Sequence, residues 1–193
     1  MEVRIGIDIG QRRTSTGICV TERERRGTED HFLVRHLERL EPGTRFPAMV
    51  DRASALVDSI DRRGQDRILV YLDVTGLGDP IYQLFSRSNS KAYWMSVSFN
   101  HGDRQVLTGG SDISLGKAYL VVRLQTLLQL GRLHLPKTPE AETLARDLLD
   151  YQIEVGPDDN ERSGAFSVGT QDDLVTALGL AVSAKTPLLR GIY

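Results

Sequence analysis

The segment 67–74, with the sequence RILVYLDV, is an almost unbroken apolar run that limits the chain to a small set of folds. A strand with one face in water alternates polar and apolar residues, so a continuous run is typical of a strand buried on both faces. Such strands lie in sheets that helices cover on both sides. The acidic residue of the run, Asp73, stands at its end, before a glycine-containing turn. We therefore expect an α/β fold with a carboxylate at the end of a buried strand.

The other segments supply further strands and the helices that cover them. Apolar residues alternate at Val3, Ile5, Ile7 and Ile9, which predicts a first strand. Polar turns separate it from two further apolar segments, which indicates an antiparallel meander. The expected strands are 3–9, 16–21, 32–40, 67–74 and 92–99, and the expected helices are 47–60, 81–85, 114–130, 139–149 and 171–184. This order resembles the ribonuclease H-like fold, a mixed five-stranded sheet flanked by helices, here with a hairpin insertion near residues 98–112.

The composition is that of an ordinary globular protein. The chain has 193 residues, a net charge of −2 and 40% hydrophobic residues, and no apolar run approaches the roughly 20 residues of a membrane span. The single cysteine, Cys19, excludes an internal disulfide and fits a reducing compartment. We expect one domain over residues 1–193, in the cytoplasm. The stretch 110–118 resembles a phosphate-binding loop but has five residues between its glycines instead of four, so we expect no ATPase domain in this chain.

Aspartates stand at three places where a core pattern does not explain them. Asp8 interrupts the first strand, Asp73 ends the run 67–74, and Asp172 and Asp173 open the last helix. A buried carboxylate is costly unless it is paired, hydrogen-bonded or bound to a metal ion. If the first strand lies beside the run, Asp8 and Asp73 are about 5 Å apart. Carboxylates with water suit Mg²⁺ or Mn²⁺, and such a group can hold two ions about 3.5–4 Å apart for phosphodiester hydrolysis.

Each aspartate also has a purely structural explanation. Asp8 can accept hydrogen bonds from backbone amides of the turn at Gly10. Asp73 can cap a helix that begins near Asp79. Residues 170–173 resemble a capping box with aspartate in place of the usual glutamate or glutamine. Capping explains only one of the two acids at that helix, and the four aspartates together favour a metal site.

Four segments, in this order, resemble the nuclease domain of the large terminase subunits of phages and prophages, which cut concatemeric DNA for packaging. They are GIDIG at 6–10, VYLDVTGLGDP at 70–80, the stretch from Lys117 through a helix to GRLHLP at 131–136, and QDDLVTALGLA at 171–181. The resemblance spans about residues 3–184. Gln171 is a departure, because the family often has histidine before the aspartate pair.

The resemblance implies a metal-dependent endonuclease that hydrolyses phosphodiester bonds of double-stranded DNA with two Mg²⁺ or Mn²⁺ ions. In this interpretation Asp8 binds both ions and Asp73 binds one of them. Asp172 and Asp173 hold the other ion.

The same resemblance implies partners and DNA contacts. Arg12, Arg13 and Lys117 are candidates for phosphate contact, which positions DNA without reading its sequence. The expected partners are double-stranded DNA, an ATPase motor domain or chain, and the portal and small terminase proteins, in the cytoplasm of a bacterial host and without a membrane. The turn 10–17 is more similar to Holliday-junction resolvases of the same fold, so a nuclease acting on branched DNA is the alternative.

Overall fold

The buried strand of the apolar run lies at the centre of a mixed sheet in the computed structural model, which describes residues 2–64, 67–150 and 172–183. The sheet has eight strands in the order β6-β7-β5-β4-β1-β2-β3-β8. They are β1 (Glu2–Asp8), β2 (Thr16–Arg26), β3 (Glu29–Leu40), β4 (Arg67–Asp73), β5 (Tyr93–Asn100), β6 (Gln105–Gly109), β7 (Asp112–Gly116) and β8 (Leu133–His134). β1 is parallel to β4 on one side and antiparallel to β2 on the other.

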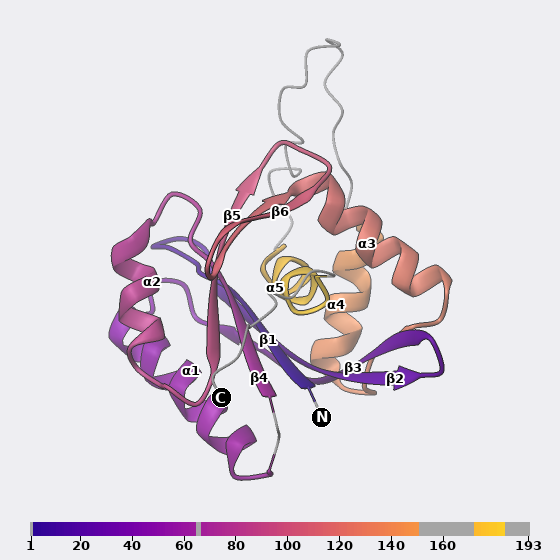
Figure 1. Cartoon of the computed structure of the whole chain (residues 1–193), viewed down its shortest axis with the longest axis horizontal. Coiled ribbons are helices and arrows are strands. Elements are labelled where there is room, and N and C mark those ends of the chain that lie inside the picture. The colour runs from indigo at the N-terminus through magenta and orange to yellow at the C-terminus, as the bar shows by residue number, and fades with distance from the viewer. Residues whose placement is uncertain (1, 65–66, 151–171, 184–193) are drawn as a thin grey trace.

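Helices cover both faces of this sheet, as the apolar run predicts (Figure 1). One layer consists of α1 (Phe46–Asp61) and α2 (Asp79–Ser86), and the other of α3 (Lys117–Gln129), α4 (Pro139–Asp150) and α5 (Asp173–Ala181). The alternation along β1 assigns its side chains to these layers: Val3, Ile5 and Ile7 pack in the core under α1 and α2. The residues between them, together with Asp8, face the layer that contains α5. In the described residues, no helix is long and apolar enough to cross a membrane.

α5 lies against the sheet in backbone contact. All nine of its residues are buried. A Cβ atom on Gly6 of β1 would lie 1.9 Å from the carbonyl oxygen of Ala177, and one on Gly17 of β2 would lie 2.4 Å from that of Asp173. Any side chain at these two positions would push the helix away from the sheet. The glycines therefore set how closely α5 approaches β1 and β2.

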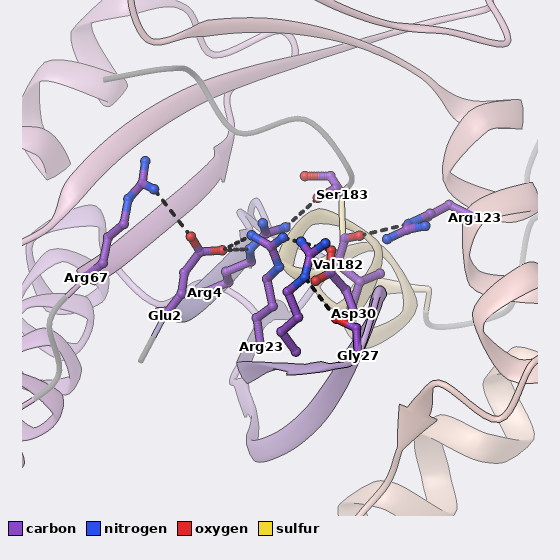
Figure 2. Close-up of polar contacts among 10 residues, drawn as sticks. Glu2, Arg4, Arg23, Gly27, Asp30, Arg67, Arg123, Val182 and Ser183 are labelled. Atoms are coloured by element: carbon purple, nitrogen blue, oxygen red, sulfur yellow. Dashed lines mark hydrogen bonds and ion pairs between the residues drawn. The ribbon is translucent and has the colours of Figure 1, made fainter. Parts of the chain in front are cut away.

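Two arginines hold the other end of α5 (Figure 2). Arg4 on β1 donates a hydrogen bond of 2.5 Å to the carbonyl oxygen of Ser183, and Arg123 on α3 donates one of 3.1 Å to that of Val182. Both guanidinium groups lie over the ring of Phe32, at 5.5 and 5.6 Å from its centroid. Cations suit the negative end of a helix, so these contacts fix the position of α5 along its axis.

Three expectations about the elements are corrected. The sheet has eight strands instead of five, because the hairpin of β6 and β7 joins one edge and the two-residue β8 joins the other. The hairpin covers 105–116 and is no separate insertion near 98–112, since β7 pairs in parallel with β5. The predicted helix 114–130 begins at Lys117, because residues 114–116 complete β7.

Candidate active site

Asp8 and Asp73 end two neighbouring parallel strands. Ile7 of β1 pairs with Leu72 of β4, so the next residue of each strand lies at the same edge of the sheet. The two carboxyl groups interact through a side-chain hydrogen bond, which contributes to raising the pKa of Asp8. The structure thus brings the two strand-end aspartates together, as the sequence predicts.

The turn after β4 orients Asp73. Its Oδ1 accepts a hydrogen bond of 2.8 Å from the backbone N–H of Thr75. The turn continues through Gly76 and Gly78, whose φ angles of 73° and 74° are readily adopted by glycine. The expectation that Asp73 could cap the next helix is wrong, because Gly78 is the N-cap residue of α2. Asp73 is therefore held toward the edge of the sheet where Asp8 lies.

The beginning of α5 brings two further carboxylates to this edge. Asp172 is the N-cap residue and is half-buried, whereas Asp173 is the first helical residue and is 6% exposed. Within the part of the chain that the structure describes, the Asp172 side chain makes no capping hydrogen bond, so capping does not account for Asp172. Thr170, the first residue of the proposed capping box, lies outside the described residues. The contact of α5 with Gly17 explains how Asp173 comes so close to the sheet.

The four carboxylates share one pocket with a volume of about 240 Å³. Lys117, at the beginning of α3, also lines it, and burial lowers the pKa of this lysine despite the opposing charges of Asp172, Asp73 and Asp8. The lining residues are Asp8, Ile9, Gly10, Thr14, Ser15, Asp73, Phe99, Lys117, Leu120, Asp172, Asp173 and Thr176. An ammonium group and four acids from four distant segments therefore meet in one cavity.

Burial, together with the crowding of like charges, favours the protonated forms of the carboxyl groups in this pocket. Burial, followed by the charges of Asp73, Asp172 and Asp173, raises the pKa of Asp8 well above its ordinary value. Burial also raises the pKa of Asp73 and that of Asp172, although Lys117 opposes both changes. Without a cation the pocket therefore favours the protonated form of Asp8. A divalent cation would replace this proton and relieve the repulsion.

The structure places Arg12 and Arg13 differently from Lys117. Both arginines are exposed on the turn between β1 and β2, and neither lines the pocket. Thr14 and Ser15, on the same turn, do line it. The two arginines therefore lie on the outer side of a loop that borders the carboxylates.

Arg39 is a site residue that the sequence analysis missed. Its Nε donates a hydrogen bond of 2.8 Å to Oδ1 of Asp173, and a terminal nitrogen donates one of 2.6 Å to Asp147 on α4. A usable signal was present, because Arg39 follows the core residue Leu37 by two positions and so faces the same side of the sheet. An arginine facing inward at the end of a strand indicates a buried acidic partner, although the sequence does not say which acid.

The donor set fits hard divalent cations. It consists of carboxylate oxygens, which Mg²⁺ and Mn²⁺ prefer. Oδ2 of Asp173 is buried and finds no hydrogen-bond partner in the ranges that the structure describes. In the described residues, no group of three or more acids, histidines or cysteines is already arranged around a metal position. Asp8 and Asp73 instead interact with each other, and Asp173 accepts a hydrogen bond from Arg39. Cation binding would need Asp8 to lose its proton and the carboxylates to turn.

A mixed sheet with carboxylates at the ends of β1 and β4, closed by an acidic helix start, defines a ribonuclease H-like domain with an acidic candidate site. The chain matches the Terminase RNaseH-like domain family over residues 5–185 and belongs to that family. The expected family and fold class are thereby confirmed. No curated protein matches the chain in sequence.

Solved structures with low sequence identity share this fold. The human cytomegalovirus terminase nuclease domain, soaked with Mn, is 15% identical with a TM-score of 0.64, over 93% of this chain and 80% of that one. The P22 large terminase nuclease domain is 16% identical with a TM-score of 0.57, over 92% of this chain and 78% of that one. The Thermus thermophilus RuvC structure gives a TM-score of 0.41, which is too low to bear on this chain.

Proposed function

We propose that the protein is a metal-dependent endonuclease that hydrolyses phosphodiester bonds of double-stranded DNA and cuts concatemeric viral DNA during genome packaging. The observation that carries this proposal is the meeting of four carboxylates from β1, β4 and α5 in one pocket of a terminase-family chain. Two similar solved structures are named as terminase nuclease domains, and one of them was soaked with Mn, which supports the proposal.

Asp8, Asp73, Asp172 and Asp173 are the ligands that we propose for two Mg²⁺ or Mn²⁺ ions. Such ions, when bound, supply an activated water and stabilise the leaving oxygen. Asp8 has to release its proton before it binds, because ligating carboxylates are ionised. Thr75 orients Asp73, and the close packing of α5 orients the aspartate pair.

The cations of the chain are proposed to position the DNA. Lys117 lines the pocket, where its ammonium group can contact the phosphate next to the scissile bond. Arg12 and Arg13 are exposed on the bordering loop and can contact phosphates farther along the duplex. The ATPase motor would be supplied by another domain or chain, and the portal and small terminase proteins would act with it in the host cytoplasm.

The decisive experiment is cleavage of a supercoiled plasmid with Mg²⁺ or Mn²⁺, comparing the parent with Asp73→Asn. We expect nicking and linearisation by the parent and a loss of about 100-fold or more in the variant, on the scale of the 10²–10³ in kcat that loss of a single oxyanion-hole donor costs in other enzymes. Asp51→Asn is the matched control, since Asp51 is exposed on α1 and does not line the pocket.

Two results would contradict the proposal: cleavage that persists in EDTA, and Asp73→Asn cleaving as fast as Asp51→Asn. Parallel assays on linear duplex and on four-way junctions decide the substrate. Cutting of junctions alone would replace the packaging nuclease by a resolvase-like enzyme with the same site.

A further inference from the structure

A row of three paired residues runs across the sheet beneath the beginning of α5. Asp8 of β1 pairs with Gly17 of β2, and Gly17 pairs with Arg39 of β3. Paired residues of neighbouring strands point to the same face of a sheet, which here is the face that α5 covers. The missing side chain of Gly17 leaves room for the Asp173 backbone. Asp173 therefore lies over the middle of the row, between an acid and an arginine.

The two oxygens of Asp173 have different environments. Oδ1 accepts a hydrogen bond of 2.8 Å from Nε of Arg39 and another of 2.8 Å from the backbone N–H of Leu174. Oδ2 is buried and has no hydrogen-bond partner among the described residues. An unpaired buried carboxylate oxygen is costly, so the fold keeps it only if something else can bind it. Asp173 also lines the pocket that contains Asp8, so this carboxylate belongs to the acidic part of the site.

A second acid holds Arg39 in place. Asp147 on α4 accepts a hydrogen bond of 2.6 Å from a terminal nitrogen of the guanidinium, while Nε serves Asp173. The side chains of the three residues are 8–22% exposed, so solvent competes little for these contacts. A planar guanidinium bonded on two edges has one orientation, and it transmits this orientation to Asp173.

We propose that Arg39 is a positioning residue of the active site, which occupies one oxygen of Asp173 so that the other is presented to a divalent cation, and that Asp147 anchors Arg39 for this task. This inference rests on the proposed function, because it assumes that the pocket binds Mg²⁺ or Mn²⁺. It assigns Asp173 as a ligand through a single oxygen and extends the functional unit to α4.

A positioning role and a purely electrostatic role of Arg39 predict opposite changes in Mn²⁺ affinity when the arginine is removed. The positive charge of Arg39 repels a cation, so its removal would tighten Mn²⁺ binding if charge alone mattered. If Arg39 positions Asp173, its removal weakens binding, and loss of such an outer-shell partner typically costs 10- to 100-fold in metal affinity. The direction of the change therefore identifies the role.

The experiment measures Mn²⁺ affinity of the full chain by electron paramagnetic resonance of free Mn²⁺, with no DNA present, for the parent, Arg39→Gln and Asp147→Asn. We expect Arg39→Gln to weaken binding 10- to 100-fold and Asp147→Asn to weaken it less, because Arg39 stays beside Asp173. Arg52→Gln is the matched control: it removes a forked ion pair with Glu38 at 2.8–3.0 Å that does not touch the pocket. The control is expected to bind Mn²⁺ like the parent.

Plasmid cleavage measured in parallel distinguishes a failure of the proposed function from a failure of the role assigned to Arg39. A parent that neither binds Mn²⁺ nor cuts DNA overturns the proposed function and this inference with it. A parent that does both, with Arg39→Gln binding Mn²⁺ as tightly as the parent or more tightly, overturns the inference alone. If Arg39→Gln fails to fold by circular dichroism, Asp147→Asn decides: weaker Mn²⁺ binding than Arg52→Gln supports the role of Arg39, and equal binding overturns it.

Discussion

Asp8 combines a position suited to metal binding with an environment that disfavours its charge. It bonds to Asp73, and burial together with three neighbouring carboxylates raises its pKa well above the ordinary value. The proton therefore binds more tightly in the folded chain than in the unfolded chain. Ionisation of Asp8 then costs stability: the cost is absent at pH values below the ordinary aspartate pKa and grows as the pH rises through the folded pKa.

Asp8→Asn is expected to raise the stability of the metal-free protein at pH 7. The amide keeps a donor for Asp73 but carries no charge, so the fall of stability with rising pH becomes shallower. A tenfold difference in proton affinity corresponds to about 1.4 kcal/mol, which sets the scale of the gain. Thermal unfolding between pH 5 and 8 in EDTA measures it, with Asp51→Asn as the control.

Addition of Mg²⁺ should make the parent more stable than Asp8→Asn. A ligand at 100 times its Kd stabilises the folded state by about 2.7 kcal/mol, and the parent should gain more of this than Asp8→Asn. An Asp8→Asn variant that melts below the parent in EDTA at pH 7 would contradict the electrostatic account of the pocket.

At the scale of elements, contacts at both ends of α5 hold the helix in place. Its beginning lies over Gly17, and its last carbonyls accept hydrogen bonds from Arg4 and Arg123 (Figure 2). Arg4 is 1% exposed, and Glu2, 2.7 Å away, balances its charge. A shift of the helix would move the aspartate pair away from Asp8, so packing and metal binding are coupled through this element.

Gly17→Ala is expected to lower the free energy of unfolding by about 1–3 kcal/mol, the usual cost of forcing extra atoms into a packed site. It should also weaken Mn²⁺ binding, because the added Cβ pushes the Asp173 backbone away from β2. Urea denaturation and Mn²⁺ titration measure the two effects. Gly27→Asn serves as the control: its φ is +62° with nothing within 4 Å, and asparagine tolerates that conformation. Equal stability of the two variants would argue against the close approach.

Arg4→Met is expected to lower the free energy of unfolding by about 3 kcal/mol, the lower end of the range for a broken buried ion pair. The lower end applies because Glu2 keeps Arg23 and Arg67 as partners. Arg35→Gln removes an exposed ion pair with Glu22 and should cost at most about 1 kcal/mol. Denaturant unfolding of both variants checks the contrast, and similar losses would mean that Arg4 does not clamp α5.

At the scale of the whole molecule, the sequence predicted what depends on local patterns. The unbroken run ending at Asp73 and the alternation before Asp8 were enough to expect neighbouring strands with acids at one edge. The register between distant strands has no such local pattern, and neither the row that contains Arg39 nor the 134-residue separation between Arg39 and Asp173 could be deduced. The addition of β8 to the sheet edge depends on tertiary pairing of only two residues, which also leaves no signal in the sequence.

Exposed arginines at opposite ends of the parallel strands β1 and β4 allow a last test. Arg12 and Arg13 border the pocket, whereas Arg62 and Arg63 follow α1 and precede β4, at the edge where that strand begins. If duplex DNA lies across the pocket, Arg12→Gln with Arg13→Gln should weaken binding equally for all sequences. The double substitution should also change the salt dependence of DNA binding. The slope of the logarithm of the association constant against the logarithm of the salt concentration should become smaller in magnitude by about 2, since each lost phosphate contact lowers that slope by about 1.

Arg62→Gln with Arg63→Gln is the matched pair, because it removes the same charge from an equally exposed dipeptide. Fluorescence anisotropy of a labelled duplex in EDTA at several salt concentrations measures both pairs without cleavage. Equal slopes for the two pairs would mean that DNA does not follow the pocket edge of the sheet. A lower slope for the Arg12 and Arg13 pair alone would orient the duplex over β1, with its backbone passing the four aspartates.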